Sequence, residues 1–441
     1  MRSLIVSESF PPLCGGSGWS TYEVARGLRQ YGVDVLIVRP RPGQPAGIVE
    51  TSYDGFEVLE FGAAAPRLPY VRNYFKNERL TRLLRPALER IIRTRGIDVV
   101  HGAHVLSTPA AIAAAAACGV PSVATIRDYW PVCYWADLIF DYDSPDLCPA
   151  CSAGMMTQCV RPRAGAAWPL ALPMIPYMRR NLARKASALS RADAVVAVSS
   201  AIARDLYARA PEVARERIQI IPNPVDLSAV QVAARLPRPD VAGPYAIYSG
   251  KLAPNKGTGK LLDAVTRSSL VWPLIIVGDG PDRARVEADA ARAQRDVRFT
   301  GWLPREEALR WLAHATIVIF PSYGPESLSR VLLESSALGL PVAAMETGGT
   351  RDIIDPERTG LLSTTVEGLA ADITRLADDE ALRERLGRAA REKAMREFDS
   401  MSVARRVLRL YEQLLDGRRP RGEARRGEDG GDGAQEGMRT P

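Results

Sequence analysis

Two lysines in the C-terminal half of the chain have the type and spacing expected for binding a diphosphate. In the segment YSGKLAPNKG, Gly250 follows a predicted strand, and Lys251 and Lys256 flank a short loop before a predicted helix. Two ammonium groups beside a helix N-terminus suit a diphosphate, because the open amide groups of the helix also favour anions. The alternative reading of this segment is a solvated, lysine-rich loop.

A second segment, FPSYGPESLSRVLLESSALGLPVAAMETGGTRDII, carries two carboxylates. Glu326 ends a loop and Glu334 lies on the predicted helix that follows, eight residues further along. That spacing corresponds to roughly 12 Å of helical rise, so one carboxylate can face a sugar while the other reaches a ribose. The amide groups of Ser327, Leu328 and Ser329 are expected to be open donors at the helix start. The plainer alternative is a helix-capping charge and a solvated face.

These residues need elements that bring them together, and short β-branched runs alternate with longer amphipathic segments along the chain. Strands are predicted in a first series at residues 4–9, 33–38, 98–101, 122–126, 194–198 and 218–221, and in a second at 245–249, 273–277, 297–300, 316–320 and 341–345. This alternation is typical of α/β folds with parallel sheets. We therefore predict two Rossmann-like, doubly wound units facing a cleft, with ligands at the carboxyl ends of the strands.

The same alternation predicts the domain boundaries. A proline-rich segment interrupts it after residue 221, and a tail with many Gly and charged residues follows the last helical pattern. We predict an N-terminal domain at 1–221 with a cysteine-rich insertion at 133–159, a linker at 222–244, a C-terminal domain at 245–399, a helix at 400–416 and a disordered tail at 417–441.

Composition limits the function classes. The 441 residues are 46% hydrophobic with a formal net charge of +7 and a pI of about 9.1, which suits anionic ligands. We find no aromatic-basic pattern or zinc-finger histidine pair that would indicate nucleic-acid binding. The N-terminus lacks a signal-peptide pattern, and no apolar stretch approaches the roughly 20 residues that span a bilayer. We expect a cytoplasmic protein.

Three further sequence motifs accompany the two segments described above. VGDGP, which contains Gly278, and FTGWLP follow in order, and FPPLCGGSGWSTYEVARGL near the N-terminus contains Gly15 and Gly16. Together with the two segments above, these blocks resemble the family 4 retaining glycosyltransferases of the GT-B fold, over roughly residues 1–415. The resemblance implies transfer of a sugar from a nucleotide-sugar donor to a lipid-linked, polysaccharide or other glycoconjugate acceptor, with retention of anomeric configuration and no cofactor.

The resemblance also implies roles for the motif residues. Lys251, where the family usually has Arg, and Lys256 would hold the donor diphosphate. Glu334 would bind the ribose hydroxyls, and Glu326 would contact the donor sugar near its reacting carbon. The other implied donor-binding positions are Gly250, Gly278, Ser327, Leu328 and Ser329, and Gly15 and Gly16 would let the N-terminal loop approach phosphate and acceptor.

One position departs from the family pattern. The family often has His-Asp where this chain has Arg127 and Asp128 in TIRDYWPVC. An arginine can neutralise a leaving diphosphate, but it cannot act as a base. We take Arg127 and Asp128 as catalytic candidates together with Glu326. His101 and His104 end another strand and either line the acceptor side or are satisfied structural histidines.

Four cysteines are clustered in the predicted insertion, at Cys133, Cys148, Cys151 and Cys159. Four thiolates, two of them in a CPAC pair, suit tetrahedral Zn²⁺. The spacing therefore predicts a structural zinc site, with reduced thiols or an iron–sulfur cluster as alternatives.

Positive charge is concentrated beside an apolar segment. No acidic residue lies between Asp146 and Asp193, whereas seven cationic residues do: Arg161, Arg163, Arg179, Arg180, Arg184, Lys185 and Arg191. The sequence WPLALPMIPYM lies among them, and the predicted helix at 71–95 is also basic. This composition suits peripheral contact with the inner face of a membrane, or else a solvated helical face.

Other classes of function fit the sequence less well. The segment GGSGWST resembles a dinucleotide loop, but its third glycine is missing and the second strand ends in VRP instead of an acidic residue, which disfavours a nicotinamide-dependent oxidoreductase. A sugar-nucleotide epimerase, a phosphorylase and a non-catalytic scaffold remain alternatives, and the presence of Lys251, Lys256, Glu326 and Glu334 argues against the last.

Overall fold

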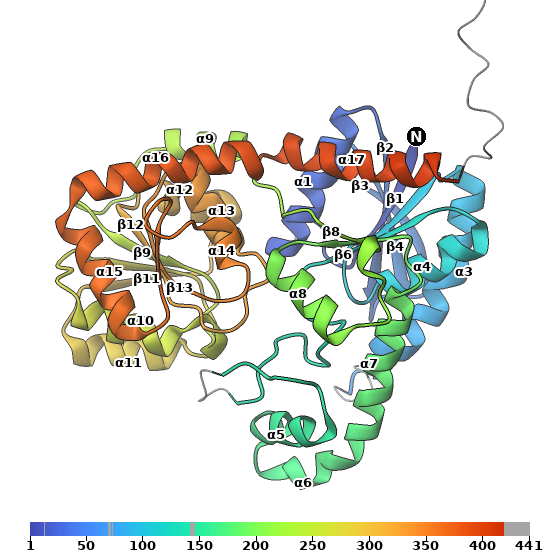
Figure 1. Cartoon of the computed structure of the whole chain (residues 1–441), viewed down its shortest axis with the longest axis horizontal. Helices are drawn as coiled ribbons and strands as arrows, with labels where there is room; N and C mark the ends of the chain where they lie inside the picture. Colours follow the sequence, from blue (N-terminus) through green and yellow to red (C-terminus); the bar gives the residue numbers. More distant parts are fainter. Residues whose placement is uncertain (13, 69–71, 73, 142–145, 419–441) are drawn as a thin grey trace, which may run out of the picture.

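The computed structural model describes residues 1–12, 14–68, 72, 74–141 and 146–418, which form two lobes that each contain one sheet (Figure 1). The first sheet has the strand order β3-β4-β2-β1-β5-β6-β7-β8. Its strands are β1 (Arg2–Val6), β2 (Asp34–Pro42), β3 (Gly47–Tyr53), β4 (Phe56–Ala63), β5 (Val99–Gly102), β6 (Ser122–Ile126), β7 (Ala194–Ala197) and β8 (Ile218–Ile220).

The second sheet has the strand order β11-β10-β9-β12-β13-β14. Its strands are β9 (Ala246–Ser249), β10 (Leu274–Val277), β11 (Val297–Gly301), β12 (Ile317–Phe320), β13 (Val342–Met345) and β14 (Leu361–Ser363). All pairs in this sheet are parallel. The prediction of two Rossmann-like parallel-sheet units is thereby confirmed.

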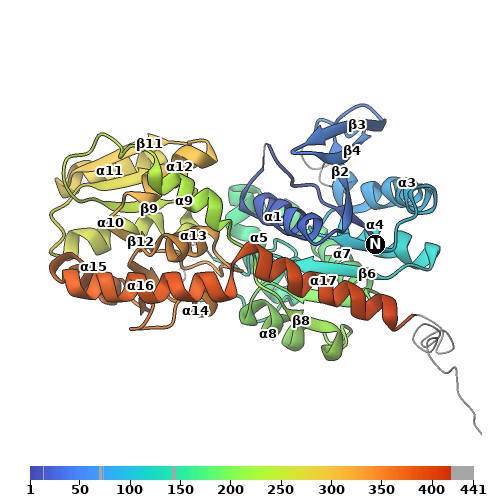
Figure 2. The same cartoon turned by 90° about the horizontal axis from the view of Figure 1, so that it is seen from above.

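The β3–β4 hairpin was not predicted. It pairs antiparallel at the edge of the first sheet and extends outward from the lobe (Figure 2). The two residues of its turn, Asp54 and Gly55, both have positive φ, at 49° and 74°. An Asp-Gly pair favours this turn because both positions need left-handed backbone.

Helices cover both faces of the first sheet because its strands are apolar on both sides. The helix α1 packs with the C-terminal α17 on one face, and α3 packs with α4 on the other. The elements of this lobe are α1 (Gly16–Gln30), η1 (Phe75–Arg79), α3 (Leu80–Arg95), α4 (Thr108–Cys118), α5 (Ala153–Ala164), η2 (Gly165–Ala167), α6 (Trp168–Ala171), η3 (Leu172–Met174), α7 (Ile175–Leu189), α8 (Ser200–Arg209) and η4 (Arg215–Arg217).

The second lobe begins inside the predicted linker, where residues 227–235 form helix α9 and pack against α12 and α13. Its elements are α9 (Leu227–Arg235), η5 (Pro254–Lys256), α10 (Thr258–Arg267), α11 (Arg283–Ala293), α12 (Arg305–Ala313), α13 (Arg330–Leu338), α14 (Thr350–Ile353), α15 (Val366–Asp378) and α16 (Glu380–Glu397). The residue boundaries of the domains themselves stay predictions.

The chain then returns to the first lobe. Helix α17 (Ser400–Asp416) continues the direction of α16 and lies along the N-terminal lobe (Figures 1 and 2). The Tyr411 hydroxyl of α17 lies 2.6 Å from Nδ1 of His101 in β5, so the last helix is fastened to the first sheet. The predicted disordered tail falls almost entirely outside the described residues. Among the helices that the structure describes, none is long and apolar enough to cross a bilayer.

Candidate functional site

A cavity of about 320 Å³ lies between the two lobes. It brings together nine of the residues that the sequence predicted for the site: Gly16, Arg127, Gly250, Lys251, Lys256, Glu326, Ser327, Leu328 and Ser329. The first two come from the N-terminal lobe and the others from the carboxyl ends of strands in the C-terminal lobe. Residues from the two halves of the chain therefore share one cleft, as expected for two facing doubly wound sheets.

Glu326 lines this cavity with a carboxylate, and its side chain is only 11% exposed. Its Oε1 atom lies 2.5 Å from Nζ of Lys256 and accepts a hydrogen bond of 2.7 Å from the Ser322 hydroxyl. No ion pair or hydrogen bond engages the ammonium group of Lys251 within the described residues. An anion entering the cavity thus meets one uncommitted lysine and one that can exchange its partner.

Two helix starts from opposite lobes contribute amide groups. Gly16 and Ser17 open α1, and Ser329 caps α13 with its hydroxyl, 3.5 Å from the amide of Leu332. In the part of the chain that the structure describes, the amides of Ser327 and Leu328 donate to no protein atom. Open amides at helix starts carry partial positive charge, so they reinforce the lysines toward an anion.

Two glycines fix the loops of the cavity by close backbone contact. Gly278, with φ of +139°, lies beneath Gly250, and a Cβ added there would come within 1.9 Å of the Gly250 carbonyl oxygen. Gly348, with φ of +51°, supports Glu326 in the same way at 2.0 Å. Gly278 therefore shapes the Lys251 loop from below and does not line the cavity. The predicted donor-binding residue Gly278 thus lies next to a residue that lines the cavity, but its own contact is with the backbone of Gly250.

Arg127 enters the cavity from β6 of the N-terminal lobe. It is buried, and its Nε donates to Asn223 at 3.0 Å while Nη1 donates to the Ala103 carbonyl at 3.1 Å. Burial lowers the pKa of Arg127 to about 10, so the guanidinium remains charged at neutral pH. Its position is held from two sides, which suits a fixed positive charge.

Glu334 does not line the cavity. It is one turn after Arg330 on α13, and its Oε1 lies 2.8 Å from the Arg330 Nε and 3.3 Å from Arg305. Both arginines also contact Glu23 of α1, whose side chain is fully buried. These four charges, which we call the interlobe ion cluster, join the lobes beside the cavity. Of the four charged residues predicted to contact the donor, Lys251, Lys256 and Glu326 therefore line one cavity, and Glu334 does not.

Four other predicted residues also lie outside the cavity lining: Gly15, His101, His104 and Asp128. His101 is buried between Thr125 and Tyr411, at 2.6 Å from each hydroxyl, which agrees with the second predicted alternative, a satisfied structural histidine. Nδ1 of His104 lies 2.9 Å from the Ser7 hydroxyl, and burial lowers the pKa of both histidines to about 3. Both are therefore neutral at pH 7.

The predicted zinc site receives no support. Within the described ranges, no group of three or more His, Cys, Asp and Glu side chains is placed to hold a metal ion. The thiols of Cys148 and Cys159 instead donate to the carbonyls of Ala150 and Met156, each at 3.3 Å. Burial raises the pKa of the Cys159 thiol to about 11, so this thiol is protonated at neutral pH when no metal is bound. The cysteine spacing predicted four tetrahedral zinc ligands, whereas the thiols of Cys148 and Cys159 donate hydrogen bonds to nearby backbone carbonyls.

Sequence reasoning missed several residues that line the cavity: Ser17, Ser20, Asn223, Tyr248, Ser322 and Arg330. Asn223 lies in the predicted linker, and no role was predicted for Arg330. The i, i+4 spacing of Arg330 and Glu334 was the available signal for their ion pair.

Known structures share this architecture. A match to the structure of sucrose-phosphate synthase from Thermosynechococcus elongatus covers 94% of this chain and 99% of that chain. Its TM-score is 0.71 and its sequence identity is 20%. A match to Anabaena HepE in complex with UDP covers 94% and 100% of the two chains, with a TM-score of 0.65 and 17% identity. These matches show that the chain has the GT-B fold, with two facing lobes that each contain one sheet.

The sequence gives the family. Residues 14–229 match the family Glycosyltransferase Family 4, and residues 237–393 match Glycosyl transferases group 1. A GDP-mannose-dependent alpha-mannosyltransferase from Mycolicibacterium smegmatis is 33% identical over 89% of this chain and 92% of its own. Its counterpart from Mycobacterium tuberculosis is 30% identical over 82% and 83%. The chain belongs to the family 4 glycosyltransferases and transfers a sugar from a nucleotide-sugar donor with retention, as the sequence predicted.

Proposed function

We propose that the interlobe cavity binds the diphosphate and sugar of the donor. The observation that carries this proposal is the meeting of Lys251, Lys256 and the open amides after Glu326 in one cleft. An incoming diphosphate takes Lys256 from Glu326, and the released carboxylate then faces the sugar. Arg127 adds a fixed charge for the departing diphosphate. Because protein cations neutralise the diphosphate, transfer needs no metal ion.

We propose GDP-mannose as the donor. Support comes from the two alpha-mannosyltransferase relatives, which match this chain over most of its length. UDP- and ADP-sugars are the alternatives, and the HepE complex shows that a chain of this fold holds UDP.

A thermal-shift screen tests the donor. GDP-mannose, UDP-glucose and ADP-glucose are compared at equal concentration in the presence of EDTA. We expect the largest rise in Tm for GDP-mannose, because a ligand at 100 times its Kd stabilises the folded state by about 2.7 kcal/mol. A larger shift with either other nucleotide would refute the donor assignment, and loss of all shifts in EDTA would refute metal-independent binding.

We propose that Asp128 acts on the acceptor side. It follows Arg127 directly, and burial raises its pKa to about 6, against the lowering effects of the Trp130 amide and the Lys185 charge. The carboxylate is therefore ionised above pH 6 and protonated below it. An ionised Asp128 can accept a hydrogen bond from the attacking hydroxyl.

This assignment predicts a pH profile. The rate of transfer at saturating donor should fall as the pH decreases through about 6, whereas Asp128→Asn should be slower and lack that inflection. Initial rates between pH 5 and 8 measure it. An unchanged inflection in the Asn variant would assign the titration to another group.

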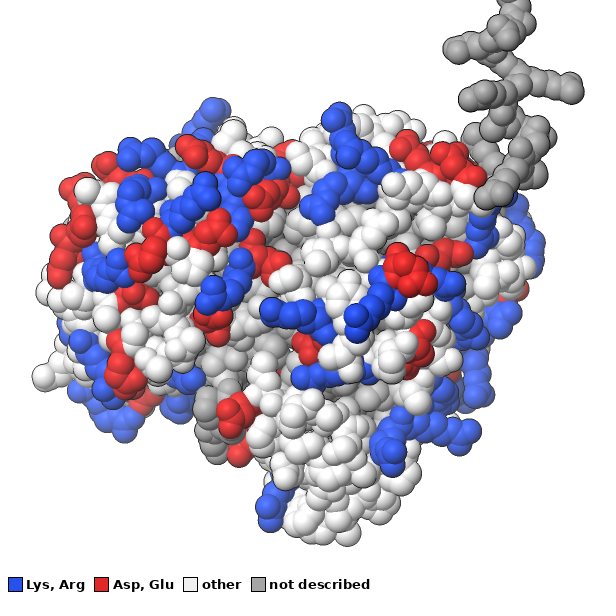
Figure 3. All heavy atoms as spheres, viewed as in Figure 1, with Lys and Arg blue, Asp and Glu red and all other residues white. Residues whose placement is uncertain are grey.

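Peripheral membrane contact remains part of this proposal. The basic residues predicted from sequence lie on α5, α7 and their flanks, and Leu170 between them is 85% exposed. Figure 3 shows few charged side chains at the end of the molecule formed by α5 and α6. An apolar end flanked by cations suits the interface of an anionic bilayer.

A further inference from the structure

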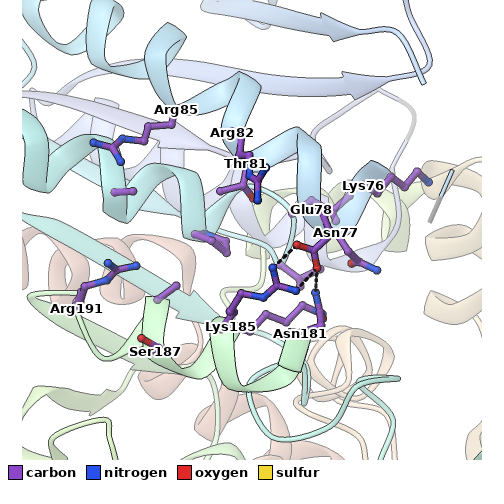
Figure 4. A pocket seen from close by; sticks show the side chains of 16 residues that line it. Lys76, Asn77, Glu78, Thr81, Arg82, Arg85, Asn181, Lys185, Ser187 and Arg191 are labelled. Carbon is purple, nitrogen blue, oxygen red and sulfur yellow. Dashed lines mark hydrogen bonds and ion pairs between the residues drawn. The ribbon is translucent and has the colours of Figure 1, made fainter. Parts of the chain in front are cut away.

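The N-terminal lobe holds a second, strongly basic cavity away from the donor site. It has a volume of about 350 Å³, and Figure 4 shows α3 and η1 on one side and α7 on the other. Six cationic residues line it: Lys76, Arg82, Arg85, Arg184, Lys185 and Arg191. Glu78 is the one acidic residue among the lining residues. Such an excess of positive charge favours an anionic ligand.

Several of these cations have no partner of their own. Glu78 is fully engaged by Arg184, at 2.5 and 2.7 Å, and by Asn181 at 3.1 Å. Lys76, Arg82 and Arg191 make no ion pair with any residue in the described portion of the chain. The cavity therefore keeps positive charge that no carboxylate of the described residues neutralises. Such unpaired cations can form charge-assisted hydrogen bonds with a phosphate.

A buried amide oxygen also points to a ligand. Asn181 is only 2% exposed and lines the cavity, and its Oδ1 atom has no hydrogen-bond partner among the described residues. A buried acceptor without a donor costs free energy, so a hydroxyl supplied by a ligand would be favourable here.

An apolar cavity of about 350 Å³ adjoins the basic one, and Asn77 lines both. Its walls are mostly aromatic and thioether side chains: Tyr74, Tyr134, Trp135, Met174, Tyr177 and Met178. Among the described residues that line it, Arg163 is the one charged side chain, and it pairs with Asp137 at 2.6 Å. A hydrocarbon chain fits such a wall, and the end of the molecule around α5 and α6 carries few charged side chains in Figure 3, which suits contact with a bilayer.

We propose that these two cavities together bind the acceptor, a membrane lipid whose headgroup carries a phosphate and whose chain occupies the aromatic cavity. Lys185 connects this site to the reaction, because it lines the basic cavity and its charge also acts on Asp128. The inference rests on the proposed function, since it names the acceptor class of the same transfer.

Calorimetric titration with dodecyl phosphate below its critical micelle concentration tests the site. Dodecyl phosphate should bind at least about tenfold more tightly than inorganic phosphate and than dodecyl maltoside, because only it fills both cavities. Arg82→Glu/Arg191→Glu should weaken its binding by about tenfold or more. Met174→Asp should weaken it while leaving the affinity for inorganic phosphate unchanged.

The matched control is Arg90→Glu/Arg179→Glu, which changes the same net charge at exposed positions on α3 and α7 that do not line either cavity. Its affinity should equal that of the wild type. Equal losses in both double variants, or equal affinity for dodecyl phosphate and inorganic phosphate, would overturn the proposal. Thermal stabilisation by the donor nucleotide is measured in every variant. If this stabilisation persists while the predicted differences in dodecyl phosphate binding are not seen, the acceptor proposal is wrong and the proposed donor site is retained.

Discussion

Glu326→Ala should lower kcat for sugar transfer by about 10²- to 10³-fold while the donor nucleotide binds at least as tightly as in the wild type. The proposed function places the Glu326 carboxylate next to the donor sugar, so its removal takes one charge from a preorganised site and the rate should fall. Affinity is retained because Lys256, which lies 2.5 Å from Glu326, loses its internal partner and becomes free for the diphosphate. Steady-state kinetics and calorimetric titration with the nucleoside diphosphate measure the two effects.

Glu287→Ala is the matched control for this variant. Glu287 also pairs with a cation, at 2.8 Å from Arg283, but lies on α11 away from the cavity. It should change neither quantity. Near-normal turnover in Glu326→Ala would remove Glu326 from the mechanism, and a large loss of donor affinity would show that its pairing with Lys256 supports binding instead of restraining it.

Arg330→Ala should destabilise the protein by about 3–5 kcal/mol, because it leaves the buried carboxylates of Glu23 and Glu334 with Arg305 as their one remaining partner among the residues that the structure describes. Burial by itself lowers the pKa of Arg330, but the charges of these two glutamates outweigh it and raise the pKa. The guanidinium is therefore charged throughout the accessible pH range. Denaturant unfolding followed by circular dichroism measures the loss.

The surface pair of Arg388 and Glu384 provides the control, because both side chains are more than half exposed and 3.9 Å apart. Arg388→Ala should leave the unfolding midpoint unchanged, as exposed pairs contribute little. If Arg330→Ala unfolds at the same denaturant concentration as the wild type, the interlobe ion cluster does not hold the lobes together.

Local motifs predicted the donor side of the site because its parts follow strands of one parallel sheet. Lys251 comes after β9 and Glu326 after β12, and these strands are neighbours, so their carboxyl ends meet. The spacing of the lysines and the glutamate was therefore enough to place them together.

The interlobe ion cluster could not be predicted in this way. Glu23 and Arg330 are 307 positions apart, and neither local pattern indicates the other. Glu334 was assigned to a ribose from its place in the motif, but the two arginines beside it occupy its carboxylate. Long-range pairing depends on how the lobes meet, which periodicity within each lobe does not determine.

The cysteine-rich insertion shows a different limit. The spacing of Cys148 and Cys151 fits a metal knuckle, but spacing does not determine the direction of a thiol, and that of Cys148 donates to the Ala150 carbonyl. The β3–β4 hairpin, by contrast, was within reach of sequence reasoning, because an Asp-Gly pair such as Asp54-Gly55 is a strong signal for a hairpin turn.

The most direct test of the donor site is the Kd of the preferred nucleoside diphosphate for Lys251→Ala/Lys256→Ala. Two charge-assisted hydrogen bonds contribute about 1.5–3 kcal/mol each, so the double variant should bind about 10²- to 10⁴-fold more weakly than the wild type. Lys260→Ala, whose ammonium lies 4.5 Å from the Tyr323 ring centroid and outside the cavity lining, should bind normally. Equal affinity of the double variant and the wild type would contradict the account.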